Sequence, residues 1–260
     1  MNEKYSFQRF WTYFKYDIVQ MWRHNGKAAL VLGGAGVILY VIHVLFSLLF
    51  PPHVWQAPSV EARGACYGIA TLAFILFQAR TYGYLTEKRA GSSWLMLPAS
   101  ASEKTVSMLL MTLVALPLAF VVVFLGTDAL ICLLDPTAGE SLFKSQNIYA
   151  LTEDGSILVP FIINIVFATA AALTYFLLSG IVFKKWKIVG GIAVLFCVMT
   201  LAVFIVSALV QSGVISIEMS EEVSKDAFKM HALWSAAAIS VLVWAGLAWG
   251  VYHRVKTLKH

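Results

Sequence analysis

Residues 28–50 read AALVLGGAGVILYVIHVLFSLLF and carry no charged side chain over 23 positions. About 20 mostly apolar residues are enough for a helix to cross the hydrocarbon core of a bilayer. The run is longer than the apolar region of a signal peptide, which has about 7–15 residues, and it ends at Phe50-Pro51-Pro52 without a small-residue cleavage site. We therefore expect 28–50 to be a retained first membrane span.

The composition of the whole chain agrees with this reading. Apolar residues make up 60% of the 260 residues, and charged residues make up 13%. A soluble chain has roughly 25% charged residues, so this one has too few to cover a water-exposed surface. Disordered chains are poor in apolar residues, which excludes that class as well. The composition predicts an integral membrane protein.

Five further stretches are long and apolar enough to span a membrane. Ser100-Ala101-Ser102-Glu103 has the pattern of a capping box, in which the serine caps a helix and the glutamate reaches back, so a helix should start at Ala101. We expect an all-α polytopic protein in which residues 28–260 form a single domain of six transmembrane helices. The predicted spans are about 28–50, 64–84, 101–134, 157–183, 188–215 and 232–252.

The distribution of charge predicts the orientation of these spans. The side that holds both termini receives 15 of the 19 Lys and Arg residues but only 4 of the 14 acidic residues. Loops on the cytoplasmic side of membrane proteins are enriched in Lys and Arg. We therefore expect both termini in the cytoplasm and attribute the net charge of +5 to orientation in the membrane rather than to nucleic-acid binding.

Residues 1–27 are expected to form a cytoplasmic amphipathic helix ahead of the first span. Seven apolar residues recur at helical spacing along one face: Phe7, Phe10, Trp11, Phe14, Ile18, Met21 and Trp22. Basic residues lie away from this face, which favours a helix lying in the membrane interface. An ordinary amphipathic helix packed on protein is the alternative.

Two connections between the predicted spans have distinctive sequences. In 80–104, the apolar run Trp94-Leu95-Met96-Leu97 is expected on the cytoplasmic side, where it needs a cover of lipid headgroups or a partner protein. Residues 217–231 are acidic, with apolar residues at helical spacing, and predict a short external helix.

No motif of a catalytic, metal or cofactor site is present. The six histidines are scattered, the three cysteines form no CxxC, and neither a G-x-S-x-G elbow nor a Walker lysine motif occurs. We expect no enzyme activity and no cofactor on this chain. Among the few polar residues of the spans, Asp128 and Asn164 are candidates for a transport pathway or for solvation at the outer interface.

Two sequence stretches resemble a known family. Leu97-Pro98-Ala99-Ser100-Ala101-Ser102-Glu103-Lys104 is similar to a stretch between the second and third spans of permease subunits of type-2 ATP-binding-cassette exporters. Phe10-Trp11-Thr12-Tyr13-Phe14-Lys15-Tyr16-Asp17 is similar to the start of permease-like proteins of Bacteroidetes. The order of elements along the whole chain also resembles that family, although its outer loop before the sixth span is shorter and more acidic than in many members.

The resemblance implies a permease in the cytoplasmic (inner) membrane of a bacterium. Its partners would be a separate ATPase subunit and a second copy or a related permease. The implied contacts of the ATPase are Glu87, Lys88, Arg89, Trp94, Leu95 and Pro98. The alternatives are a non-enzymatic scaffold, immunity or regulatory protein on the same frame, or a secondary carrier.

Overall fold

The computed structural model describes residues 5–51, 53–86, 94, 96–145, 155–211 and 225–258. Five of the described helical segments are long and apolar enough to cross a membrane: Val60–Thr86, Ala101–Leu134, Val159–Val182, Lys187–Ile205 and Ala232–Thr257. A sixth is present if Asn25–Gly33 and Ala35–Leu49, which meet at an angle of 51°, count as one bent span. The predicted all-α polytopic membrane fold is confirmed.

The amphipathic helix and the beginning of the first span form one continuous helix. Helix α1 runs over Phe7–Gly33, and α2 follows over Ala35–Leu49. The expected boundary at residue 27 is therefore not a helix end, because a single glycine there, Gly26, costs only about 1 kcal/mol and does not stop a helix. The helix breaks instead at Gly34. Just before the break α1 lies close to α6, since a Cβ on Gly33 would be 2.8 Å from Val123.

The second and third spans begin at capped helix ends. Helix α3 covers Val60–Thr81 and continues into the short helix η1 at Gly83–Thr86. The third span starts at Ala101, as predicted, and consists of α5 (Ala101–Leu110), the π-helical turn η2 (Met111–Ala115) and α6 (Leu116–Leu134). Pro117 has no backbone N–H and its ring crowds the preceding turn, so the wider π turn lets the helix continue past it.

The remaining elements follow the predicted order. Helix η3 (Pro136–Ala138) and α7 (Leu142–Ser145) lie after the third span. The last three spans are α8 (Gly155–Val182), α9 (Lys187–Gln211) and α10 (Lys225–Thr257). Of the predicted external helix, 217–224 lies outside the described residues. Residues 225–231 are the first turns of α10 and not a separate helix, because no helix-breaking residue separates them from the last span.

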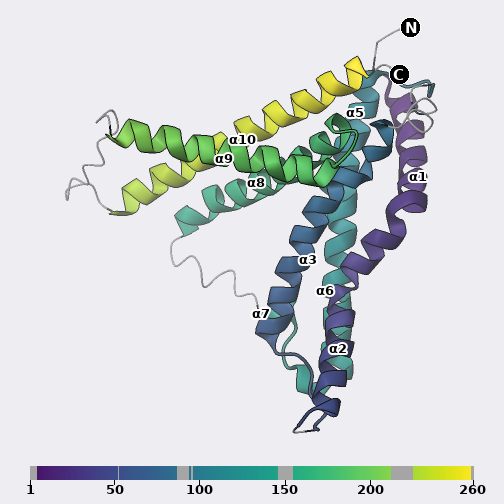
Figure 1. The fold of residues 1–260 in the computed structure, drawn as a ribbon, viewed down its shortest axis with the longest axis vertical. Coiled ribbons are helices and arrows are strands. Elements are labelled where there is room, and N and C mark those ends of the chain that lie inside the picture. The colour runs from purple at the N-terminus through teal and green to yellow at the C-terminus, as the bar shows by residue number, and fades with distance from the viewer. Residues whose placement is uncertain are drawn as a thin grey trace.

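The helices form two groups that meet at one end. In Figure 1, α2, α3 and α6 run down the view, whereas α8, α9 and α10 run to the left, and both groups diverge from the end where α5 and the chain ends lie. Helix α8 joins the groups because it packs on both α3 and α10. Gly180 permits this packing, since a Cβ there would clash with the backbone of Ala79.

Three clusters of buried apolar side chains hold the described helices together. The largest lies at the meeting end and includes residues of α1, η1, α5, η2, α8 and α10. A second cluster, built around Phe74, Phe120 and Phe124, lies between α3 and α6. A small third cluster at Ala57, Ile131 and Ala138 packs the loops at the far end. We call the first end the terminal end and the opposite end, with residues 51–59 and 135–142, the loop end.

Candidate functional site

Some residues on the amphipathic face of α1 are buried against the rest of the protein, and the others are exposed. Phe10, Phe14 and Met21 are buried in the largest core cluster, so the alternative of packing on protein applies to them. The membrane domain itself supplies the surface they pack on. The other predicted members of this face remain exposed: Phe7, Trp11, Ile18 and Trp22. Their interfacial role stays a prediction.

Glu103 ties the start of α1 to the start of α5. Its Oε1 accepts hydrogen bonds from the backbone N–H of Ser6 at 2.7 Å and from Arg9 at 2.9 Å. Its Oε2 accepts from the backbone N–H of Ser100 at 2.8 Å, which completes the predicted capping box. One carboxylate therefore serves two helix ends that are nearly a hundred residues apart in the sequence.

A second carboxyl group is buried between the same helices. Asp17, only 2% exposed, accepts hydrogen bonds on Oδ2 from the hydroxyls of Tyr82 and Ser107, both at 2.6 Å. Among the described residues it forms no ion pair. Burial raises the pKa of Asp17 above its ordinary 3.8, and the two hydrogen bonds oppose that rise. The arrangement can hold a proton on Asp17.

Trp94 is buried and not displayed on the surface. It is 5% exposed, its indole Nε1 donates to the Tyr13 hydroxyl at 2.7 Å, and Lys104 Nζ lies 4.5 Å from its ring centroid. The expected exposed apolar patch is thus wrong for this residue, because α1 covers it. Met96, which is 83% exposed, and Pro98 remain accessible. Glu87, Lys88, Arg89 and Leu95 lie outside the described residues.

A hollow of about 470 Å³ adjoins this region. It lies between the start of α1 and the turn before α5, and its walls include Arg9, Tyr13, Leu97 and Pro98. Burial, followed by the nearby carboxylate of Asp17, raises the pKa of the Tyr13 hydroxyl on its floor, so that group stays protonated. The hollow joins the first helix and the 94–100 segment into one surface.

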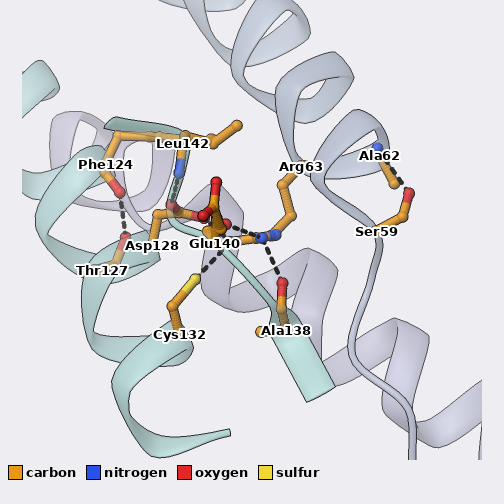
Figure 2. A network of polar contacts seen from close by, with 10 residues as sticks. All are labelled: Ser59, Ala62, Arg63, Phe124, Thr127, Asp128, Cys132, Ala138, Glu140 and Leu142. Atoms are coloured by element: carbon orange, nitrogen blue, oxygen red, sulfur yellow. Dashed lines mark hydrogen bonds and ion pairs between the residues drawn. The ribbon is translucent and has the colours of Figure 1, made fainter. Parts of the chain in front are cut away.

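At the loop end, Arg63 and Asp128 form a buried ion pair (Figure 2). Arg63 NH1 donates to Asp128 Oδ1 at 2.6 Å, and its NH2 donates to the carbonyls of Ala138 and Glu140, both at 2.7 Å. Asp128 Oδ2 accepts from the backbone N–H of Leu142 at 2.7 Å. Asp128 is 3% exposed, so the expected solvation at an outer interface is replaced by this pair. Whether it lines a pathway stays a prediction.

Asp135 holds the neighbouring loop. Its carboxylate accepts from the Thr137 backbone and hydroxyl and from the side chains of Tyr40 and Trp55. The hydrogen bonds, first those of Thr137 and then that of Trp55, lower the pKa of Asp135 to about 2. Together with Arg63, this residue links α2, α3 and α6 to the loops at 51–59 and 135–142. These contacts hold the helices and loops of this end together. We call the Arg63–Asp128 ion pair and the hydrogen bonds of Asp135 the loop-end clasp.

Asn164 takes part in a contact between the last spans. Its Oδ1 accepts a hydrogen bond from Ser240 at 2.7 Å, which joins α8 to α10 within their apolar faces. Among the residues that the structure describes, no group of three His, Cys, Asp or Glu side chains could hold a metal ion. Asn164 lies on α8, in one helix group, and Asp128 lies on α6, in the other, so the structure does not bring these two residues together.

Several of these residues were missed by sequence reasoning, although signals for two of them existed. The predicted second span begins at 64 and leaves Arg63 outside it, yet Ser59, a capping residue, and Glu61 mark a helix start at Val60 that places Arg63 in its first turn. Asp17 lies at helical spacing on the same face as Phe10, Phe14 and Met21, so a buried acid could have been expected. For Asp135 the sequence offered no comparable signal.

Comparisons of the chain with protein-family models, with curated proteins and with solved structures found no match.

Proposed function

We propose that this chain is the membrane-spanning subunit of an ATP-binding-cassette exporter. A separate ATPase would dock on the terminal end, at the connection between the second and third spans, and a second permease copy or a related permease would complete the pathway. On this proposal ATP is hydrolysed by the partner, the chain itself carries no cofactor, and both termini face the cytoplasm of a bacterium.

The observation that carries the proposal is the joint between the 94–104 segment and α1. Trp94 binds Tyr13, and Glu103 binds both Ser6 and Arg9. A force applied to this connection would therefore reach α1 directly as well as α5, which begins the third span. Such a joint suits a subunit that must transmit the movement of an attached motor to several spans.

The exposed side chains beside this joint support a docking role. Pro98 is exposed and lines the hollow together with the basic residue Arg9 of α1, and Met96 is exposed two residues before it. An exposed apolar side chain rimmed by charge is typical of a protein–protein contact. The scaffold alternative shares this surface, but it requires no ATP hydrolysis, which gives a means to separate the two.

The test uses the full chain purified from its native membranes. Met96→Glu introduces a charge on the proposed docking surface without touching the core, unlike a change at buried Trp94. Val54→Glu, at an exposed apolar residue of the loop end, is the matched control. We expect wild type and Val54→Glu to co-purify with ATP hydrolysis. The ATPase activity that co-purifies with Met96→Glu should be lower by at least about ten-fold, because an unpaired charge in an interface costs more than about 1.4 kcal/mol.

Three outcomes would contradict the proposal. Retention of the ATPase by Met96→Glu would show that docking occurs elsewhere. Absence of ATP hydrolysis from every preparation would favour the scaffold alternative, and transport driven by an ion gradient without ATP would favour a carrier.

A further inference from the structure

A second hollow lies on the other side of the terminal end, where three candidate spans end. Its volume is about 410 Å³, and it lies between the end of α3 and the turn that joins α8 to α9. Its walls are formed by Arg80, Lys184, Trp186, Lys187, Ile188 and Val189. We call this hollow the basic pocket, because three of its six residues are cations and none is acidic.

The backbone around the basic pocket is held in place by hydrogen bonds. Lys187 Nζ donates to the carbonyl of Gly83 at 2.6 Å, and the hydroxyl of Ser179 donates to the carbonyl of Lys187 at 2.6 Å. The first bond joins α9 to η1, and the second joins α8 to α9. The backbone around the pocket is therefore tied to three helices, η1, α8 and α9.

Trp186 is displayed at the edge of this pocket in an unusual backbone conformation. Its φ is 59°, in the left-handed region that bulky residues rarely adopt, and its side chain is 76% exposed. The N–H of Gly190 donates to its carbonyl at 2.6 Å, which holds the turn. A strained, exposed tryptophan at the end of a membrane span is typical of a residue placed at the headgroup level.

Two of the three cations of the basic pocket, Arg80 and Lys184, have no acidic partner in the described part of the chain. Arg80 and Lys184 are exposed and form no ion pair with any residue that the structure describes. Ile188 and Val189 supply an apolar wall, which continues along the exposed face of α9 through Ile192 and Phe196. Cations at one end of an apolar face match a phosphate group attached to hydrocarbon chains.

We propose that the basic pocket binds an anionic phospholipid, with its phosphate between Arg80 and Lys184 and an acyl chain along α9. Basic pockets between membrane helices bind anionic headgroups in this way, and the cytoplasmic leaflet is the one rich in such lipids. A free phosphate would satisfy the cations equally, but it would leave the apolar wall exposed to water. The apolar wall therefore favours the lipid as the source of the phosphate.

The test measures binding of phosphatidylglycerol and phosphatidylcholine to the purified full chain by native mass spectrometry. The variant Arg80→Gln/Lys184→Gln removes the two unpaired cations. The control Lys185→Gln/Lys256→Gln removes two exposed charges at the same end that do not line the pocket. Each basic side chain near an anionic headgroup raises the binding affinity about five-fold. The first variant lacks two of them, so its affinity for phosphatidylglycerol should be about 30-fold lower. The control should change binding by less than about three-fold, because its charges act only at a distance.

Fluorescence gives a second readout that does not depend on charge removal. Brominated phosphatidylglycerol should quench the emission of the wild type more than that of Trp186→Phe, since Trp186 lies at the pocket edge. Equal losses in both double variants, or no loss in either, would overturn the proposal. Displacement of the lipid by inorganic phosphate at equal concentration would do so as well, because it would identify a site for soluble phosphate. The unfolding temperature of each variant confirms that it is folded.

Discussion

Asp128 and Asp17 are almost equally buried, at 3% and 2% exposure, but they lie at opposite ends of the helices and have different partners. At the loop end, Arg63 neutralises Asp128 and also binds two loop carbonyls. At the terminal end, Asp17 has two hydroxyl donors and no cation among the described residues. The charge of Asp128 is thus compensated by a cation, whereas burial raises the pKa of Asp17 and favours its protonated form.

Removal of Arg63 should have the largest effect. Arg63→Met leaves Asp128 buried without its cation and leaves two carbonyls without a donor, which should lower the free energy of unfolding by about 3–5 kcal/mol. Chemical denaturation in detergent measures the loss. The double variant Arg63→Met/Asp128→Leu should recover part of it, because the unpaired charge is gone. If the single variant lost less than about 1 kcal/mol, the pair would not be the clasp of the loop end.

Asp17 should give a smaller effect that depends on pH. Because its pKa is raised in the folded protein, the unfolded chain releases this proton first as pH rises above 3.8. Stability from this residue is therefore complete below that value and is lost as pH rises through the raised pKa. Thermal unfolding between pH 4 and about 8 should show this decline in the wild type and a flatter profile in Asp17→Asn. At low pH the variant itself should cost about 1 kcal/mol or less, because Asn keeps one acceptor.

Asp135 provides the control with the opposite sign. Its pKa is lowered to about 2 by Thr137 and Trp55, so its stabilisation is present above the ordinary pKa of 3.8 and is lost as pH falls toward about 2. Asp135→Asn should therefore remove stability at neutral pH and leave the decline caused by Asp17 unchanged. Identical pH profiles for the two variants would contradict the difference between the ends.

The Arg9–Glu103 pair should give the smallest effect. The Arg9 side chain is 43% exposed, so solvent screens its attraction to Glu103. Arg9→Gln should lower the free energy of unfolding by about 0.5 kcal/mol, because the backbone donors Ser6 and Ser100 remain. Glu103→Ala removes all three contacts and should cost several times more. Equal losses from both variants would mean that the ion pair, and not the helix caps, joins α1 to α5.

Membrane spans could be predicted from the sequence because length and apolar content are local properties. The capping box at Ser100 and Glu103 likewise lies within four residues and placed the start of the third span correctly. The partners of buried polar groups could not be predicted in this way. Arg63 and Asp128 are 65 residues apart, and Trp94 meets Tyr13 across 81 residues, so only the packing of the helices brings them together.

The break at Gly34 makes α1 a rigid arm with a joint at its end. With 27 residues at 1.5 Å each, the arm is about 40 Å long. A rotation of about 10° at the joint would carry its first turn through about 7 Å, given that length. Because Tyr13 and Arg9 of α1 are bonded to Trp94 and Glu103, such a swing would carry Trp94 and the start of α5 with it. The loop-end clasp lies beyond the joint, so the far loops would stay in place. A small movement at the centre of the molecule thus corresponds to a large one at the end where the chain starts.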